Sequence, residues 1–93
     1  MSVQYPRYRA IAIDLSEADQ SFDPPLEKLV VSEAGVVEFD TDDGSTVRYT
    51  HPQSNSGEGV EGTVPFTLQA VITRIDNGNT TVPSANLLGL QRI

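Results

Sequence analysis

The chain has 93 residues, and six Lys and Arg against thirteen Asp and Glu give a net charge of −7 at pH 7. This length fits one domain. The acidic balance disfavours nucleic acid and anionic membranes as partners, because both attract clustered Lys and Arg. No apolar run approaches the roughly 18 residues of a membrane span. The sequence has no Cys, which excludes disulfides, thiol nucleophiles and thiolate metal sites.

The first predicted strand covers Tyr8–Leu15, where β-branched and polar residues alternate with a period of two. Its odd-numbered positions should face the core, with Arg9 at the margin. Residues 16–25 break this pattern. Ser16 could cap one short helical turn, and the proline pair at positions 24 and 25 should end any helix there.

Two strands are predicted next, at residues 26–32 and 36–41. Ala34 and Gly35 form the turn between them. In the second of these strands Val37 and Phe39 should face inward, because polar residues alternate with them.

An Asp-Gly pair within residues 42–45 is typical of a tight hairpin turn, since such turns need positive φ angles. A strand should return over residues 46–50, with Val47 and Tyr49 inward. Residues 51–63 are rich in Gly, Ser and Asn and are predicted to form a loop.

The longest strand is predicted at Val64–Ile75. One face of it should carry Val64, Phe66, Leu68, Ala70 and Ile72. A turn follows at residues 76–79, and residues 86–93 close the chain. The pattern shows no helix of ordinary length. It therefore predicts an all-β fold, a small antiparallel β-sandwich or barrel of about six to seven strands.

Catalytic chemistry finds little support in the residue pattern. His51, the single histidine, is expected to be a solvated loop residue, because general-base catalysis needs a preorganised partner. The acidic residues between positions 14 and 23 are interpreted as a solubilising surface, not as a glycosidase pair. We therefore expect no enzyme activity, no catalytic residue and no cofactor.

A second acidic group, Asp40, Asp42 and Asp43, precedes Gly44. We interpret it as the solvated tip of a hairpin, since the spacing fails the EF-hand pattern, and we assign no metal site. A weak calcium site at these carboxylates remains the alternative. It would suit a small calcium-assisted carbohydrate-binding β module.

The N-terminal residues 1–8 are predicted to form an arm, and residues 9–93 a single β domain. Tyr5, Arg7 and Tyr8 combine aromatic area with positive charge, which is typical of interface hot spots. We expect these three residues to contact another subunit. Fraying of the arm is the alternative.

Three segments of the chain carry a resemblance to a known family. They are Arg9-Ala10-Ile11-Ala12-Ile13, the run from Leu29 to Val37, and Val64 to Val71 followed by Gly78-Asn79-Thr80-Thr81 and Ala85 to Leu90. This order resembles the small spike-base proteins on the heads of tailed phages and gene transfer agents. The chain departs from their pattern in the loop at residues 51–63 and at Phe66.

The resemblance implies a virion structural protein on the capsid exterior. Such a protein is the base of a head spike or fibre, or a decoration (cement) protein. Its partners would be the major capsid protein and a spike or fibre protein. The resemblance also implies a cyclic homo-oligomer, a pentamer or trimer. Pairing of copies would relieve the thin core and open sheet edges of so small a domain.

Overall fold

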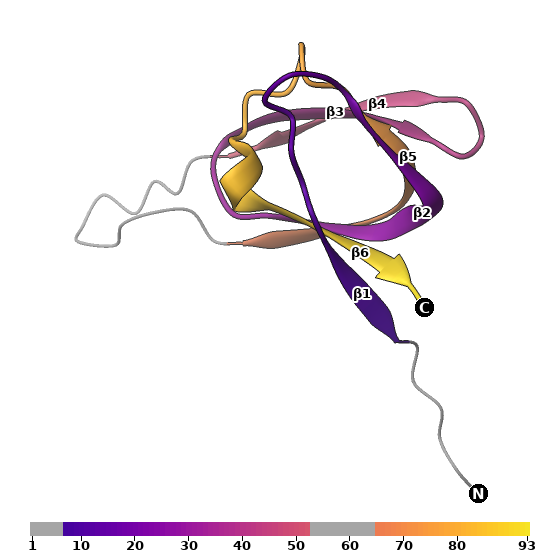
Figure 1. The fold of residues 1–93 in the computed structure, drawn as a ribbon. Coiled ribbons are helices and arrows are strands. Elements are labelled where there is room, and N and C mark those ends of the chain that lie inside the picture. The colour runs from indigo at the N-terminus through magenta and orange to yellow at the C-terminus, as the bar shows by residue number, and fades with distance from the viewer. Residues whose placement is uncertain (1–6, 53–64) are drawn as a thin grey trace, which may run out of the picture.

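The computed structural model describes residues 7–52 and 65–93. The chain is all-β, as the sequence predicts (Figure 1). Its six strands are β1 (Tyr8–Ala12), β2 (Gln20–Val31), β3 (Gly35–Thr41), β4 (Thr46–His51), β5 (Phe66–Ile75) and β6 (Leu87–Arg92). A single 3-10 turn, η1 (Ser84–Asn86), precedes β6 in the described part of the chain.

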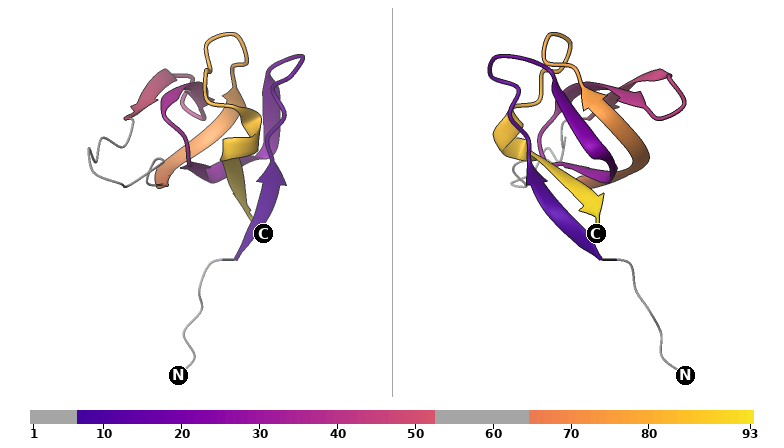
Figure 2. Two further views of the ribbon diagram at one scale, coloured as in Figure 1. Left: turned by 90° about the vertical axis from the view of Figure 1, so that its left-hand side faces the viewer. Right: turned by 45° about the vertical axis from the view of Figure 1, so that its right-hand side comes forward.

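All strand pairs are antiparallel and belong to one six-stranded sheet with the order β1-β6-β2-β5-β3-β4. The sheet curls strongly, so that its strands surround the core instead of lying flat (Figures 1 and 2). Within the described residues, β1 and β4 have one neighbouring strand each. The sheet therefore has two edges and does not close into a complete barrel.

The central strand β2 is also the longest, with 12 residues against 10 in β5. It pairs with β5 along one side and with β6 along the other. The predicted break in the strand pattern is confirmed over residues 16–19, but its extension to residue 25 and the helical turn at Ser16 are wrong. The chain is bent at positions 16–18, and β2 begins at Gln20. The proline pair lies inside β2, where the register with β5 shifts between Ser21 and Leu26, and prolines are tolerated at such irregularities.

The core consists of apolar side chains from β2, β3, β5, β6 and the segments beside them. They are Ile13, Phe22, Leu26, Leu29, Val31, Val37, Phe39, Ile72, Ile75, Val82 and Leu87. The inward positions of Val37 and Phe39 are thus confirmed. Two other predicted core positions are wrong, because Val47 is 39% exposed and Phe66 is 47% exposed. Strict alternation failed at both places because β4 lies at the edge of the sheet and β5 enters it at Phe66.

Two predicted turns are confirmed. Gly44 lies in the β3–β4 turn with a φ of 88°, in the region that favours glycine. In the turn after β5, the Asp76 carboxylate accepts hydrogen bonds from the backbone N–H groups of Gly78 and Asn79, at 2.7 and 2.9 Å. The first strand is shorter than predicted and ends at Ala12. Val64 and most of the predicted loop at residues 51–63 lie outside the described residues.

We predict that Gly89→Ala destabilises the fold by about 1–3 kcal/mol, the usual cost of overpacking a core. Gly89 is buried in β6, and a Cβ there would lie 2.8 Å from both terminal carbons of Leu26 and 3.3 Å from Cδ1 of Ile13. Leu26 is fully buried and has little room to move. Urea unfolding followed by circular dichroism measures the loss.

Gly78→Ala is the matched control. The nearest atom to a Cβ at Gly78 is an Asp76 carboxylate oxygen at 3.4 Å, in an exposed turn. The free energy of unfolding should therefore change by less than about 0.5 kcal/mol. Equal losses in the two variants would contradict close packing of β6 on Leu26.

Candidate interaction surface

A cation–aromatic cluster lies where β1, β6 and β2 meet. Tyr8, the first residue of β1, is opposite Arg92 of β6 in the strand register. The Lys28 amino group from β2 lies 4.8 Å from the centre of the Tyr8 ring, and the Arg92 guanidinium lies 6.0 Å from it. Arg92 also forms an ion pair with Glu27 at 2.8 Å. The side-chain hydrogen bond with Tyr8, followed by the charge of Glu27, raises the pKa of Arg92.

Two of the three predicted interface residues lie at this end of the sheet. Tyr8 belongs to the sheet, which begins one residue before the predicted boundary at position 9. Arg7 lies at the same end of the sheet, because its carbonyl accepts a hydrogen bond from the N–H of Ile93 at 3.0 Å. Tyr5 lies outside the described residues. Contact of these residues with another subunit stays a prediction.

The cluster forms one end of a larger surface, which we name the outer face. It is the side of β1, β6 and β2 that points away from the core. Residues opposite each other in an antiparallel pair share a face, and side chains alternate along each strand. The register therefore gathers small and apolar residues between the strand ends: Ala10, Ala12, Val30, Leu88 and Leu90. Leu88 at the centre is 41% exposed.

A second group of rings lies where β4 ends and β5 begins. The rings of Tyr49 and Phe66 are stacked with centres 5.6 Å apart, and those of His51 and Phe66 are 6.5 Å apart. The Tyr49 hydroxyl and Nδ1 of His51 form a hydrogen bond of 2.9 Å. The prediction of a solvated loop histidine is wrong, because His51 is the last residue of β4 and only 5% exposed. Its neighbours on β5 come from distant sequence, so local composition misplaced it.

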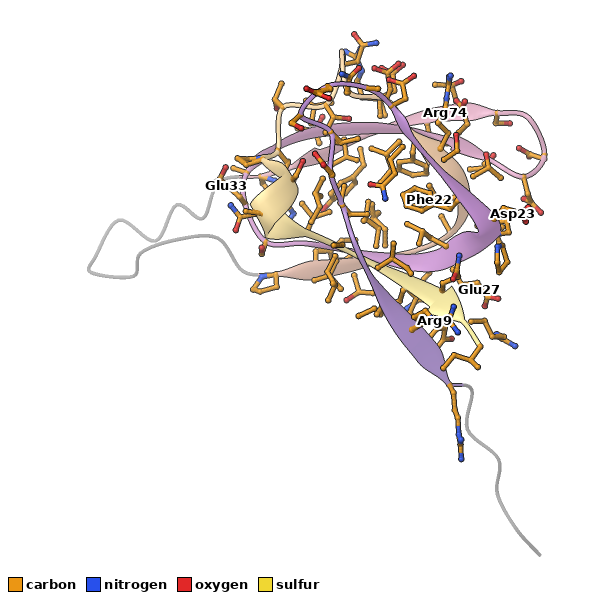
Figure 3. The ribbon with its side chains drawn as sticks, viewed as in Figure 1. Arg9, Phe22, Asp23, Glu27, Glu33 and Arg74 are labelled. Carbon is orange, nitrogen blue, oxygen red and sulfur yellow. The ribbon has the colours of Figure 1, made fainter. Side chains whose placement is uncertain are left out.

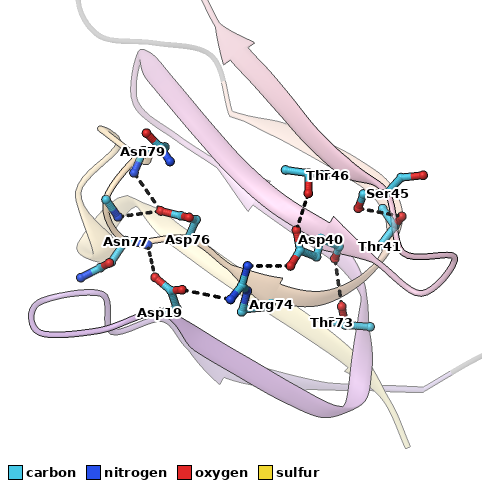
Figure 4. Close-up of polar contacts among 11 residues, drawn as sticks. Asp19, Asp40, Thr41, Ser45, Thr46, Thr73, Arg74, Asp76, Asn77 and Asn79 are labelled. Carbon is cyan, nitrogen blue, oxygen red and sulfur yellow. Dashed lines mark hydrogen bonds and ion pairs between the residues drawn. The ribbon is translucent and has the colours of Figure 1, made fainter.

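The acidic residues near the β3–β4 turn have separate local roles, and Figure 4 shows the contacts of Asp40. Asp40 forms an ion pair with Arg74 at 2.9 Å and accepts a hydrogen bond from the Thr46 hydroxyl. Asp43 accepts hydrogen bonds from the Thr41 hydroxyl and from the N–H of Ser45. Across residues 7–52 and 65–93, no three His, Cys, Asp or Glu side chains are grouped so as to hold a metal ion. The alternative of a calcium site at Asp40, Asp42 and Asp43 therefore gains no support.

The second acidic stretch lines an open depression of about 300 Å³. Its walls come from residues 14 and 16–20. Asp14 accepts hydrogen bonds from the N–H and hydroxyl of Ser16, which lower the pKa of its carboxyl. Asp19 pairs with Arg74 at 3.3 Å and accepts a hydrogen bond from the N–H of Asn77. These carboxylates order turns, and their pattern gives no sign of a buried acid–base pair.

Comparisons with known proteins give no match among family models, curated sequences or solved structures. Among the residues that the structure describes, no helix has the length and apolar character needed to cross a membrane.

We predict that Tyr49→Phe lowers the free energy of unfolding by about 1 kcal/mol, the usual net value of one hydrogen bond. The change keeps the stack on Phe66 and removes only the hydroxyl that bonds His51. Thr50→Val is the control, because Thr50 is an exposed residue of the same strand. Thermal unfolding of both variants checks the prediction. An unchanged Tyr49→Phe protein would show that the bond adds nothing to stability.

The pKa of Asp43 is lowered, chiefly by the hydrogen bond from the Thr41 hydroxyl and then by that from the Ser45 N–H. A lowered pKa means that the ionised carboxylate favours the fold, and this contribution is lost as pH falls through the lowered value. We predict that Thr41→Val moves the pKa of Asp43 up towards its ordinary value. Carbon-detected NMR titration measures this shift.

Asp14 is the internal control in the same titration, because its lowered pKa has a separate cause in Ser16. The Asp14 pKa should be the same in the parent and the Thr41→Val variant. An Asp43 pKa that fails to rise would contradict the assigned cause.

Proposed function

We propose that the chain is a virion structural protein, bound to the capsid exterior as the base of a head spike or fibre or as a decoration protein. The observation that carries the proposal is an open β-sheet with two edge strands, β1 and β4. Open edges offer unpaired N–H and C=O groups to a neighbouring chain. The resemblance to spike-base proteins supplies the class of partner.

The exposed apolar residues support a role in assembly. Val47, Phe66, Val71 and Leu88 are large apolar side chains that are each at least 39% exposed. Phe66 of β5 stacks on Tyr49, two residues from Val47 along β4, and Leu88 comes from the outer face. Apolar residues gathered on a small domain are typical of surfaces that become covered by another protein. The major capsid protein and a spike or fibre protein are the proposed partners.

The charge supports an outward position on the particle. A net charge of −7 repels nucleic acid and suits a surface exposed to solvent. The cations that the chain does have are concentrated near Tyr8, where Arg7, Arg9, Lys28 and Arg92 account for four of the six Lys and Arg. Such a local patch suits contact with an acidic region of a protein shell.

The test is co-purification with virus-like particles from the source cells. Particles are separated by density after nuclease treatment, and the chain is measured by mass spectrometry relative to the major capsid protein. We expect a fixed ratio of the two across the particle peak. An antibody to the chain should also label intact particles, because the proposed position is exterior.

Two results would reject the proposal. One is recovery of the chain only in the fractions without particles. The other is labelling that appears only after the particles are broken open. A tagged chain with Gly78→Ala serves as the control and should bind like the parent, since this exposed turn follows β5, which is not an edge strand.

A further inference from the structure

The outer face of β1, β6 and β2 has opposite charges at its two ends. At one end lie Lys28 and Arg92, both beside the Tyr8 ring, and of these two cations Arg92 is also paired with Glu27. The outward row of β1 then continues through Ala10 and Ala12. Beyond the strand, the alternation places Ile13 in the core and leaves Asp14 exposed.

A second carboxylate lies at this acidic end. Glu33 follows the end of β2 and accepts a hydrogen bond from the Asn86 side chain at 3.3 Å, beside the start of β6. Leu15, next to Asp14, also reaches this end, since its N–H donates to the Ser84 hydroxyl of η1 at 3.0 Å. Figure 3 shows Glu33 on the opposite side of the molecule from Arg9 and Glu27, which mark the cationic end.

Between the two ends, the surface is apolar, and its β1 part carries only short side chains. Ala10 and Ala12 are exposed and carry only methyl groups, and Leu88 is 41% exposed beside them. Face-to-face sheets pack about 10 Å apart with interdigitating side chains. The small residues of β1 leave recesses and the leucines of β6 project beside them, so the surface has the uneven shape that interdigitation needs.

We propose that a second copy of this chain packs on the outer face through a two-fold axis. A two-fold axis that lies across the strands brings each patch onto the same patch of the partner, turned end for end. The cationic end of one copy then lies over the acidic end of the other, and the apolar centres meet. Lys28 faces Asp14 of the partner subunit, and the partner's Lys28 faces Asp14.

The charge pattern favours a two-fold pair over the cyclic trimer or pentamer implied by the resemblance. In a ring, each copy uses two different patches, so the outer face would not meet itself. The overall charge of −7 on each copy repels. Salt screens such long-range repulsion over about 8 Å at physiological ionic strength, whereas charges in contact are screened much less. The local pairs therefore decide how the copies are oriented.

The test is the mass of the purified full chain at micromolar concentration, measured by light scattering and analytical ultracentrifugation. We expect the mass of two 10.1 kDa chains. Lys28→Glu and Asp14→Lys should each raise the dimer dissociation constant at least about tenfold, because each puts like charges together. The double variant with both changes should recover the dimer. Within one chain the register places Lys28 in the row of Leu90 and Ala10, and Asp14 lies four residues beyond Ala10, about 13 Å if the chain stays extended.

Controls separate the interface from local folding. Ser16→Ala removes a hydroxyl that donates to Asp14 but keeps the charge, so it should dimerise like the parent. Leu88→Ser should weaken the dimer, whereas Val47→Ser should not, although Val47 is nearly as exposed, at 39%. This last pair also tests the proposal if a charge-reversed variant fails to fold, as judged by circular dichroism.

A monomer, trimer or pentamer in the parent protein would overturn the two-fold pair. So would a double variant that stays as weak as the single ones, or equal effects of Leu88→Ser and Val47→Ser. The outcome is independent of the proposed virion role, because it uses the isolated chain. Failure of the particle test leaves the mass measurement unaffected, and the reverse also holds.

Discussion

The fold depends on one strand that has to pair on both sides. β2 pairs with both β5 and β6 between Leu26 and Val31, and its inward side chains Leu26, Leu29 and Val31 are fully buried. A strand with two neighbours leaves few backbone groups unpaired, which matters because unpaired buried groups are costly. The register shift near the proline pair lets β2 bend while it stays paired with β5 on both sides of the shift. The sheet can then curl around a core that only 93 residues have to fill.

The same arrangement determines which surfaces remain for other molecules. With β2 in the middle, β1 and β4 become the edges. A single curled sheet has one face on the core and one on the outside, so the outward residues of β1, β6 and β2 are left uncovered by the described chain. Interaction through edges and the outer face is thus a consequence of the topology. It supports the proposed assembly role and the proposed self-pairing without requiring reactive groups.

The candidate surfaces could be predicted from the sequence only where they depend on neighbours along the chain. The sequence shows Tyr8 as an aromatic residue among cations, and its role at an interface stays a prediction, but its contacts with Lys28 and Arg92 arise from the pairing of distant strands. His51 was misplaced for the same reason. A Gly-rich stretch follows His51 in the sequence, yet its ring is buried and stacks with Phe66, which belongs to another strand. Neighbouring residues in the sequence therefore do not indicate contacts with residues of a distant strand.

By itself, the sequence determined the all-β class, the inward residues of β3 and the positions of the tight turns. These features depend on side-chain alternation and on the φ angles that Gly and Asp allow, which are properties of short segments. The tertiary structure alone decided the strand order, the passage of β2 through its proline pair, and the exposure of Val47 and Phe66. Each of these depends on which strand lies beside which, and hydrophobic burial sets that choice through contacts between residues far apart in the chain.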